Sequence, residues 1–481
     1  MKALSILGTS SNSGKSWLAT AFCHLLYRKG LKVAPFKAQN MSNNSYATLG
    51  GEEIGRAQAV QAEACGLLPS WQMNPVLLKP SGNAQSQVLL RGRVQQHLSA
   101  REYFSKIEDY WQAVELTLQE WGGQWDALVL EGAGSPVELN LMGRDIANLR
   151  PIRHLDGRWL LCADIERGGV FAQIVGTWNL LPKDMQDRCL GIVVNKFRGD
   201  LSLFSDAEKY LKKYVSAPLL GTLPYRNDLQ PEPEDSLSLK LDSGDAEGEV
   251  MAWIQLPHLS NSTDAEPWGE DKGVRVKWMQ RPSELGDARI LVIPGSKDTL
   301  SDLQWLQDTG WAEAIVNSSI LVIGICGGYQ MLGRSLQDTE GVAGLAGQVD
   351  GLGCIPMDTI FEEQKLVQQV VVSLLGGDVS WTGYEIHMGR SQQDEEVSHF
   401  LEVDGQGEGV ELGRFRGTYV HGLFDHPAAR LAVTTAAGFS AHVAGERTWQ
   451  ESKSLLYAGM ADCLEQHLNL DPVFEYLAID E

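Results

Sequence analysis

Residues 8–16 have the composition of a phosphate-binding loop. They read GTSSNSGKS, follow an apolar run and precede a helical pattern. Backbone N–H groups in such a loop, together with a helix N-terminus, bind phosphates. Lys15 would reach the outer phosphates, and the Ser16 hydroxyl would bind Mg²⁺. Gly8 stands one residue earlier than in the usual spacing, with Thr9 in its place. The predicted ATP-binding residues here are Gly8, Thr9, Gly14, Lys15 and Ser16.

Two charged residues follow predicted strands in the same half of the chain. Glu131 comes after the apolar run 125–130, and Lys37 is the residue after the run 32–36. Ligands bind outside the carboxyl ends of parallel strands. We therefore expect Glu131 to hold Mg²⁺, directly or through water. Lys37 is either a binding residue for an anionic substrate group or an ordinary surface lysine, and its position alone leaves both interpretations open.

A cysteine in the second half has the surroundings of a catalytic nucleophile. Residues 324–330 read GICGGYQ and follow the predicted strand 320–323. Glycines around Cys326 permit a tight strand-to-helix turn, and a helix N-terminus keeps a thiol ionised. The N–H of Gly327 can donate to an oxyanion. His421 ends the predicted strand 417–420, and a cysteine with a distant histidine is typical of a thiol amidase.

The elements that would position these residues alternate between short apolar strands and helices. Such alternation predicts α/β domains, each with a parallel sheet covered on both faces. An acidic, proline-containing stretch at 226–249 separates two such patterns. We expect two doubly wound domains, at residues 1–235 and 250–481, joined by an acidic linker at 236–249.

Composition excludes several functional classes. The 481-residue chain is long enough for two or three domains, and its formal net charge of −22 disfavours nucleic acids and anionic membranes as partners. Seven cysteines without a C-x-x-C motif suit the reducing cytoplasm. There is no signal-peptide pattern and no stretch of ~18 apolar residues that could span a membrane. The expected partners are small molecules, and the sequence leaves the oligomeric state open.

The motifs of the first half resemble known P-loop enzymes. The extended loop spacing, followed by EGAG at 131–134, resembles the dethiobiotin synthetase type, which phosphorylates a carboxylate-like group. The segments FKAQNMS (36–42), GRAQ (55–58), DIERGGVF (164–171) and NKFRGD (195–200) are more closely similar to the cobyric acid synthase family. This resemblance implies that Asn195 reads the adenine ring and that Glu53 is a second Mg²⁺ carboxylate.

The second half resembles the class I, or triad, glutamine amidotransferases. That resemblance implies that Cys326 is the nucleophile, His421 its base and Gln330 a contact to bound glutamine. The turn 294–296, which contains Gly295, would be the second turn on the oxyanion side. Standard members carry Glu two residues after the histidine, where this chain has Leu423. We therefore expect a Cys–His dyad.

The resemblance to cobyric acid synthases extends from Gly8 to about Phe424. It implies ATP- and glutamine-dependent amidation of the peripheral carboxylates of adenosylcobyrinic acid a,c-diamide, through an acyl phosphate, to give adenosylcobyric acid in cobalamin biosynthesis. Three alternatives remain open. The sister enzyme that amidates the a and c carboxylates shares both domain types, although KAQN at 37–40 favours the first assignment. A ligase acting on a cell-wall lipid precursor usually divides the two domains between chains. A regulatory P-loop ATPase with an inactive amidase would not need both Cys326 and His421.

Overall fold

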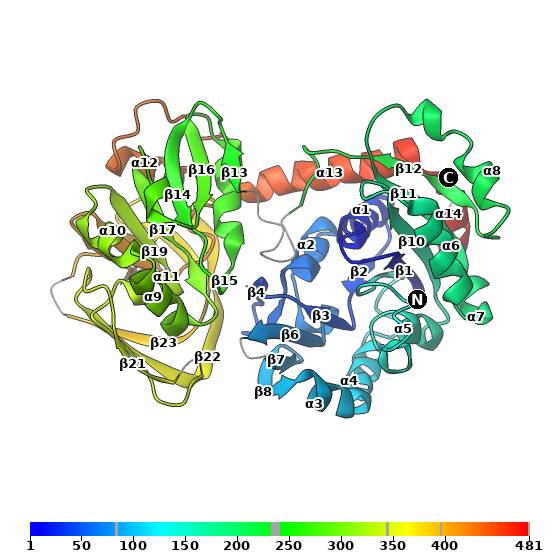
Figure 1. The fold of residues 1–481 in the computed structure, drawn as a ribbon, viewed down its shortest axis with the longest axis horizontal. Helices are drawn as coiled ribbons and strands as arrows, with labels where there is room; N and C mark the ends of the chain where they lie inside the picture. The colour runs from blue at the N-terminus through cyan, green and yellow to red at the C-terminus, as the bar shows by residue number, and fades with distance from the viewer. Residues whose placement is uncertain (82–84, 232–240, 343–345, 395–396, 480–481) are drawn as a thin grey trace.

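The protein consists of two α/β domains that lie side by side (Figure 1). The computed structural model describes residues 1–81, 85–231, 241–342, 346–394 and 397–479. Each domain is built on its own predominantly parallel sheet. A long helix, α13 (Trp449–His467), crosses from the second domain back to the first. The expected α/β architecture with two parallel sheets is confirmed.

The sheet of the first domain has the strand order β12-β11-β10-β1-β9-β2, and all its strands are parallel. Its strands are β1 (Lys2–Gly8), β2 (Val33–Phe36), β9 (Ala127–Glu131), β10 (Arg158–Asp164), β11 (Cys189–Phe197) and β12 (Leu219–Pro224). Alternate residues of β1 join cores on opposite faces, because successive side chains of a strand point to opposite sides. Helices α1 (Lys15–Arg28) and α2 (Arg56–Ala64) cover one face. The other face carries α4 (Ile107–Glu120), α5 (Leu149–His154) and α6 (Val170–Leu180).

Two small sheets extend the first domain and were not predicted from the sequence. One has the order β3-β6-β7-β8, and the other pairs β4 with β5. Their bounds are β3 (Gln39–Met41), β4 (Ser45–Ala47), β5 (Glu53–Gly55), β6 (Val76–Ser81), β7 (Gln85–Leu90) and β8 (Arg93–Ser99). The short helices of this domain are α3 (Ala100–Ser105), α7 (Lys183–Gln186) and α8 (Ala207–Leu211). In Figure 1, β4, β6 and β7 lie on the side of the first domain that faces the second.

The second domain has a sheet in the order β13-β16-β14-β17-β19-β27-β26, whose two edge strands are antiparallel to their neighbours. Its strands are β13 (Asp242–Gly244), β14 (Glu249–Ile254), β16 (Val274–Met279), β17 (Ile290–Ile293), β19 (Leu321–Ile325), β26 (Val410–Leu412) and β27 (Phe415–Thr418). Its helices are α9 (Thr299–Asp308), α10 (Trp311–Asn317), α11 (Gly327–Met331) and α12 (Pro427–Ala436). The five neighbouring strands from β16 to β27 are parallel to one another. The carboxyl ends of β14, β17, β19 and β27 therefore lie at one edge of the sheet.

A second, largely antiparallel sheet lies beside this one. It is dominated by the long hairpin of β22 (Met357–Leu374) and β23 (Ser380–Gln393), with a register shift between Phe361 and Leu366. Its remaining strands are β20 (Ser335–Asp338), β21 (Gly347–Asp350), β24 (Leu401–Val403) and β25 (Gln406–Glu408). The two-stranded pair β15 (Leu259–Ser260) and β18 (Gly295–Ser296) completes the domain.

The C-terminal helices contradict the expected boundary of the second domain. The helix α13 and the following α14 (Asp471–Leu477) pack into the core of the first domain, together with α1, β1 and β10. Met460, Ala461 and Leu464 of α13 are completely buried there. The apolar side of α13 thus covers a face of the first sheet. The helices from the N-terminal half of the chain do not cover that face completely. The second domain therefore ends before α13, and not at residue 481.

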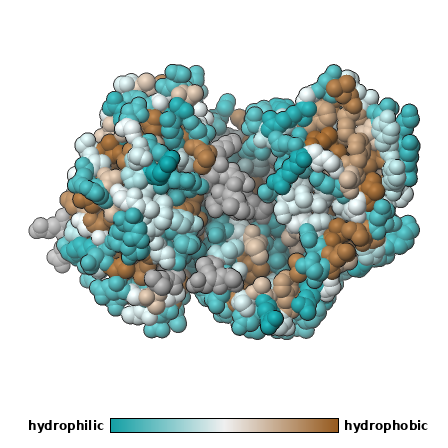
Figure 2. All heavy atoms as spheres, viewed as in Figure 1, coloured by the Kyte–Doolittle hydropathy of each residue, from teal (hydrophilic) through white to brown (hydrophobic). Residues whose placement is uncertain are grey.

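The expected linker is also shorter than predicted. Residues 236–240 lie outside the described part of the chain, but Asp242–Gly244 form β13, which pairs with β16 at the edge of the second sheet. On the surface, Figure 2 shows hydrophilic side chains spread over both domains, with apolar groups concentrated on the first. Within the described residues, no helix is both long and apolar enough to cross a bilayer.

Candidate functional site

The phosphate loop joins β1 to α1, as predicted. Gly14 has φ 102°, a left-handed conformation that favours glycine, and α1 begins at the next residue. The Lys15 ammonium group donates to the carbonyl oxygens of Ser10 and Gly134, each at 2.9 Å. Lys15 is therefore held between the loop and the turn after β9.

The close packing of this loop explains its glycines. A Cβ on Gly8 would lie 2.3 Å from Ser13 Oγ and 3.0 Å from the Lys15 side chain. A Cβ on Gly14 would lie 1.9 Å from the amide nitrogen of Asn195. That amide donates to the Ser13 carbonyl at 3.1 Å, so Asn195 supports the loop backbone directly. The hydroxyl of Thr9 donates to Gln173 at 3.1 Å, away from the loop itself.

Glu131 ends β9 and is the centre of a buried polar cluster. Its Oε1 accepts from the Ser16 hydroxyl and from the Lys37 ammonium group, both at 2.8 Å. Gln61 donates to Oε2 at 2.5 Å. Lys37 is buried, so the interpretation of an ordinary surface lysine is wrong. A serine hydroxyl and a carboxylate this close are a donor set that suits Mg²⁺, which typically keeps waters and phosphate oxygens as its other ligands.

Cys326 occupies the tight turn between β19 and α11. Its backbone has φ 52° and ψ −106°, a conformation that costs a non-glycine residue roughly 1–3 kcal/mol. The turn has no room for larger neighbours: a Cβ on Gly328 would lie 1.9 Å from the Ile293 carbonyl. The Cys326 thiol lies 3.4 Å from the carbonyl oxygen of Ile386. The strained turn thus presents the sulfur at the carboxyl edge of the sheet.

A buried aspartate contacts His421, so the expectation of a Cys–His pair without a third member is wrong. Asp264 Oδ2 lies 2.7 Å from Nδ1 of His421, and Asp264 Oδ1 accepts from the N–H of Gly422 at 2.8 Å. Both side chains are almost fully buried. With Nδ1 held by the carboxylate, Nε2 lies on the other side of the ring, where the Asn261 side-chain amide is 3.2 Å away and the Cys326 sulfur is a further hydrogen-bond partner. Asp264 therefore has the position of the third member of a triad. Leu423, which stands where standard members carry Glu, is part of the hydrophobic core.

The charges around His421 favour its protonated form. Burial opposes a charge on the ring, but the Asp264 carboxylate and the Cys326 sulfur outweigh it and raise the pKa of His421 to about 10. These two groups therefore favour the protonated, cationic form of the ring. Such a ring provides the positive charge beside the sulfur, and the proton for a departing amine, that attack on an amide requires.

The predicted glutaminase residues meet at one cavity of about 440 Å³. Cys326, His421, Gly295 and Gln330 all line it. A Cβ on Gly327 would lie 2.7 Å from the Ser296 nitrogen, so the two turns expected on the oxyanion side are in contact. The Gln330 amide donates to the Tyr419 hydroxyl at 3.3 Å and accepts from Thr299 at 3.4 Å.

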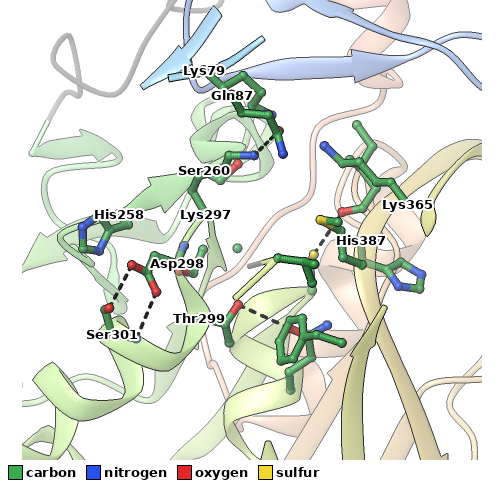
Figure 3. A pocket seen from close by; sticks show the side chains of 18 of the residues that line it. Lys79, Gln87, His258, Ser260, Lys297, Asp298, Thr299, Ser301, Lys365 and His387 are labelled. Atoms are coloured by element: carbon green, nitrogen blue, oxygen red, sulfur yellow. Dashed lines mark hydrogen bonds between the residues drawn. The ribbon is translucent and has the colours of Figure 1, made fainter. Parts of the chain in front are cut away.

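The first domain forms part of the wall of this cavity. Lys79, Gln85, Gln87 and His97 line it together with residues of the second domain. Figure 3 shows Lys79 and Gln87 beside strands of the first domain, and Lys365 beside a strand of the second. Lys297, which follows the oxyanion-side turn, donates to Gln87 at 2.7 Å. The glutaminase cavity is therefore shared between the domains.

Glu53 lies at this shared wall and not with Ser16 and Glu131. Its two oxygens accept from the ammonium groups of Lys79 and Lys365, and its side chain is 1% exposed. Burial opposes ionisation of Glu53, but the nearby lysines hold its pKa well below its usual range. Because two cations already occupy both oxygens, these surroundings argue against the expected role of Glu53 as a second Mg²⁺ ligand.

Sequence reasoning missed Asp264 and the lysines of the shared wall. Asp264 lies in a 3₁₀ segment, Ser262–Glu270, beyond the carboxyl end of β14. The available signal was the polar segment that follows β14. Because β14 and β27 end at the same edge of the sheet, that segment could have been expected near His421. Lys79 and Lys365 carry no local signal, since they meet only when the domains dock.

Comparisons with known proteins match each of the two domains. The family model of the CobQ/CobB/MinD/ParA nucleotide binding domain matches residues 4–239, and that of the CobB/CobQ-like glutamine amidotransferase domain matches residues 250–429. A cobyric acid synthase of Desulfitobacterium hafniense (strain DSM 10664 / DCB-2) is 44% identical over 454 residues, which cover 89% of this chain and 88% of that protein. A cobyric acid synthase of Synechocystis sp. (strain ATCC 27184 / PCC 6803 / Kazusa) is 40% identical over 495 residues, which cover 99% of each chain.

Proposed function

The chain belongs to the cobyric acid synthase family, and we propose that it catalyses ATP- and glutamine-dependent amidation of the peripheral carboxylates of adenosylcobyrinic acid a,c-diamide. The product would be adenosylcobyric acid, in cobalamin biosynthesis. The observation that carries the proposal is the cavity that is lined by Cys326 and His421 and, on one side, by side chains of the P-loop domain. A nitrogen donor site and an ATP site within one chain are the requirements of a glutamine-dependent ligase.

In the second domain, the Cys326 sulfur would attack the side-chain amide carbon of glutamine. The oxygen of the tetrahedral intermediate would accept hydrogen bonds from the N–H of Gly327 and from the turn at Gly295. His421, held by Asp264, would donate its proton to the departing nitrogen, which leaves as ammonia. Water would then hydrolyse the thioester to release glutamate and restore the thiol. We assign Gln330 as a contact to the bound glutamine.

In the first domain, a substrate carboxylate would attack the γ-phosphorus of ATP, which forms an acyl phosphate and breaks the bond to the bridging oxygen, so that ADP leaves. A carboxylate is a poor electrophile, whereas its acyl phosphate has a good leaving group that ammonia can displace. Lys15 would neutralise charge on the transferred phosphoryl group, and Ser16 with Glu131 would hold Mg²⁺, which supplies further charge neutralisation when bound. Lys37 would bind an anionic group of the substrate, and Asn195 would contact the adenine ring.

The direct test is incubation with ATP, Mg²⁺, glutamine and adenosylcobyrinic acid a,c-diamide, followed by mass spectrometry. Stepwise replacement of acid by amide groups is the expected result. A parallel incubation with cobyrinic acid separates the sister activity, since amidation at the a and c positions alone would contradict the proposal. We propose that the reaction takes place in the cytoplasm, where the seven free cysteines would stay reduced.

A further inference from the structure

Three lysines gather in the glutaminase cavity around a single buried carboxylate. Lys79 comes from β6, Lys365 from β22 and Lys297 from the loop after β18. All three line the same cavity as Cys326. Lys79 and Lys365 are ion-paired with Glu53, and their side chains are 2% and 12% exposed. Lys297 donates to the neutral amide of Gln87, and no carboxylate within the described residues pairs with it.

This lysine cluster carries more positive charge than its surroundings balance. Burial and the charges of the other two lysines lower the pKa of Lys297 well below its usual range, although Glu53 acts in the opposite direction. Burial likewise lowers the pKa of Lys79 to about 8, despite the attraction of Glu53. Buried charges are ordinarily paired, because an unpaired ion in a low-dielectric site is costly. One carboxylate therefore faces three basic groups, and the cluster lacks negative charge.

The other acidic residues along the cavity do not supply that charge. Asp298 is engaged in capping α9, where it accepts from the N–H of Ser301 at 3.2 Å and from the Ser301 hydroxyl at 2.8 Å. Glu340 is exposed at the rim. An anionic ligand inside the cavity would restore the balance and would keep the lysines protonated. Its anionic group has to fit in the same cavity as the reactive sulfur.

We propose that Lys79, Lys297 and Lys365 bind the α-carboxylate of L-glutamine, so that the glutamine site is completed by the first domain. The inference rests on the proposed function. Glutamine carries its α-carboxylate at the opposite end from the amide that Cys326 attacks, and the cavity contains both the sulfur and the lysines. The ligand carboxylate would take the place of the missing negative charge, beside Lys297.

The consequence is a specificity site that neither domain possesses alone. Lys79 is contributed by the first domain, while Lys297 and Lys365 are contributed by the second. Glu53 and Gln87 of the first domain hold the two lysines of the second in place. Glutamine would therefore be bound well only when the ligase domain is docked against the glutaminase domain.

The test compares glutaminase kinetics for L-glutamine and for its α-amide, which has no α-carboxylate. The full chain should prefer L-glutamine, and Lys297→Met should raise the KM for L-glutamine about 10–100-fold, as expected for loss of a charged hydrogen bond. Its kcat should change much less, and its KM for the α-amide should stay near that of the unmodified chain. Lys79→Met should show the same loss of preference. Lys183→Met, at an exposed lysine outside the cavity, is the matched control.

Lys297→Met keeps the test decisive if Lys79→Met fails to fold, since Lys297 is only half-buried and bonds only to an amide. An unchanged preference for L-glutamine over its α-amide in folded Lys297→Met would overturn the proposal. So would a rise in the KM for the corrinoid, measured with ammonium as nitrogen source, without any change in the KM for glutamine. Failure of the proposed function would be seen separately, as absence of corrinoid amidation by the unmodified chain.

Discussion

The phosphate site and the glutaminase site are built in different ways. The phosphate site depends mainly on one continuous loop, residues 8–16, completed by Glu131 at the end of the neighbouring strand. The glutaminase site draws Cys326, His421 and Asp264 from segments far apart in the chain, and lysines from both domains. A loop of the first kind is recognisable from its residues, whereas a site of the second kind exists only after the sheet and the domains have assembled.

The largest expected effect separates the two sites through the nucleophile. Cys326→Ala should reduce glutamine-dependent amidation roughly 10⁴-fold or more, because the covalent step is lost. Amidation from high external ammonium at raised pH should persist, since an acyl phosphate reacts with ammonia from any source. Product formation with the two nitrogen sources is the measurement. Continued use of glutamine would place the nucleophile elsewhere, and loss of both activities in a folded protein would mean that the sites are not separable.

The reciprocal change acts on the phosphate loop. Lys15→Ala should lower amidation from either nitrogen source roughly 10²–10³-fold, because the charge that opposes the transferred phosphoryl group is removed. Glutamine hydrolysis at Cys326 should survive at least in part. Assays of glutamate release and of amide formation on the same preparation measure the difference. Near-normal amide synthesis would contradict the role of Lys15.

The third change tests the aspartate that the sequence did not reveal. Asp264→Asn should lower the glutaminase kcat roughly 10²-fold or more, because an uncharged partner no longer orients and stabilises the His421 imidazolium. The charge of Asp264 helps to raise the pKa of His421, so its removal should lower that pKa. A protonated His421 is lost as the pH rises through its pKa.

The alkaline limb of the glutaminase rate, near pH 10 in the unmodified chain, should therefore move to lower pH in Asp264→Asn. The pH profile of kcat/KM measures this shift. Asp425→Asn is the matched control, because Asp425 is the acidic residue closest in sequence after His421. A shift of the alkaline limb that is equal in both variants would show that the effect is not specific to Asp264.

The smallest expected effect concerns the helix that joins the domains. Leu464→Ala, at a fully buried position of α13, should lower the free energy of unfolding by about 2–5 kcal/mol, because it leaves a cavity in the core of the first domain. Leu455→Ala, at a position of the same helix that is 56% exposed, should change it by less than about 0.5 kcal/mol. Denaturant unfolding followed by fluorescence and circular dichroism is the measurement. Equal losses would show that α13 is not part of that core.

Features that depend on residues close together in the chain could be predicted from the sequence. Alternating strands and helices gave the two parallel sheets, and Gly14, Lys15 and Cys326 lie in turns whose geometry is set by neighbouring residues. Asp264 escaped prediction because its contact with His421 depends on the order of strands in the sheet.

The remaining misses have the same cause at a larger scale. The helical pattern of α13 was recognisable, but an apolar stripe does not specify which domain it covers. The Mg²⁺ role that the family resemblance implies for Glu53 stays a prediction, but its pairing with Lys365 could not be foreseen, because that lysine is supplied by the other domain. Contacts between residues far apart in the chain leave no periodicity or spacing that can be recognised in a single sequence.

The return of α13 to the first domain affects how the protein is made on the ribosome. Most of the first domain is synthesised before residue 235, but the helices that complete its core begin at Trp449. At translation rates of 5–20 residues per second, its apolar face would wait on the order of 10–40 s for them. During that time the nascent domain exposes the surface that α13 later covers. The chain is therefore expected to depend on chaperones during synthesis, and to finish folding its first domain last.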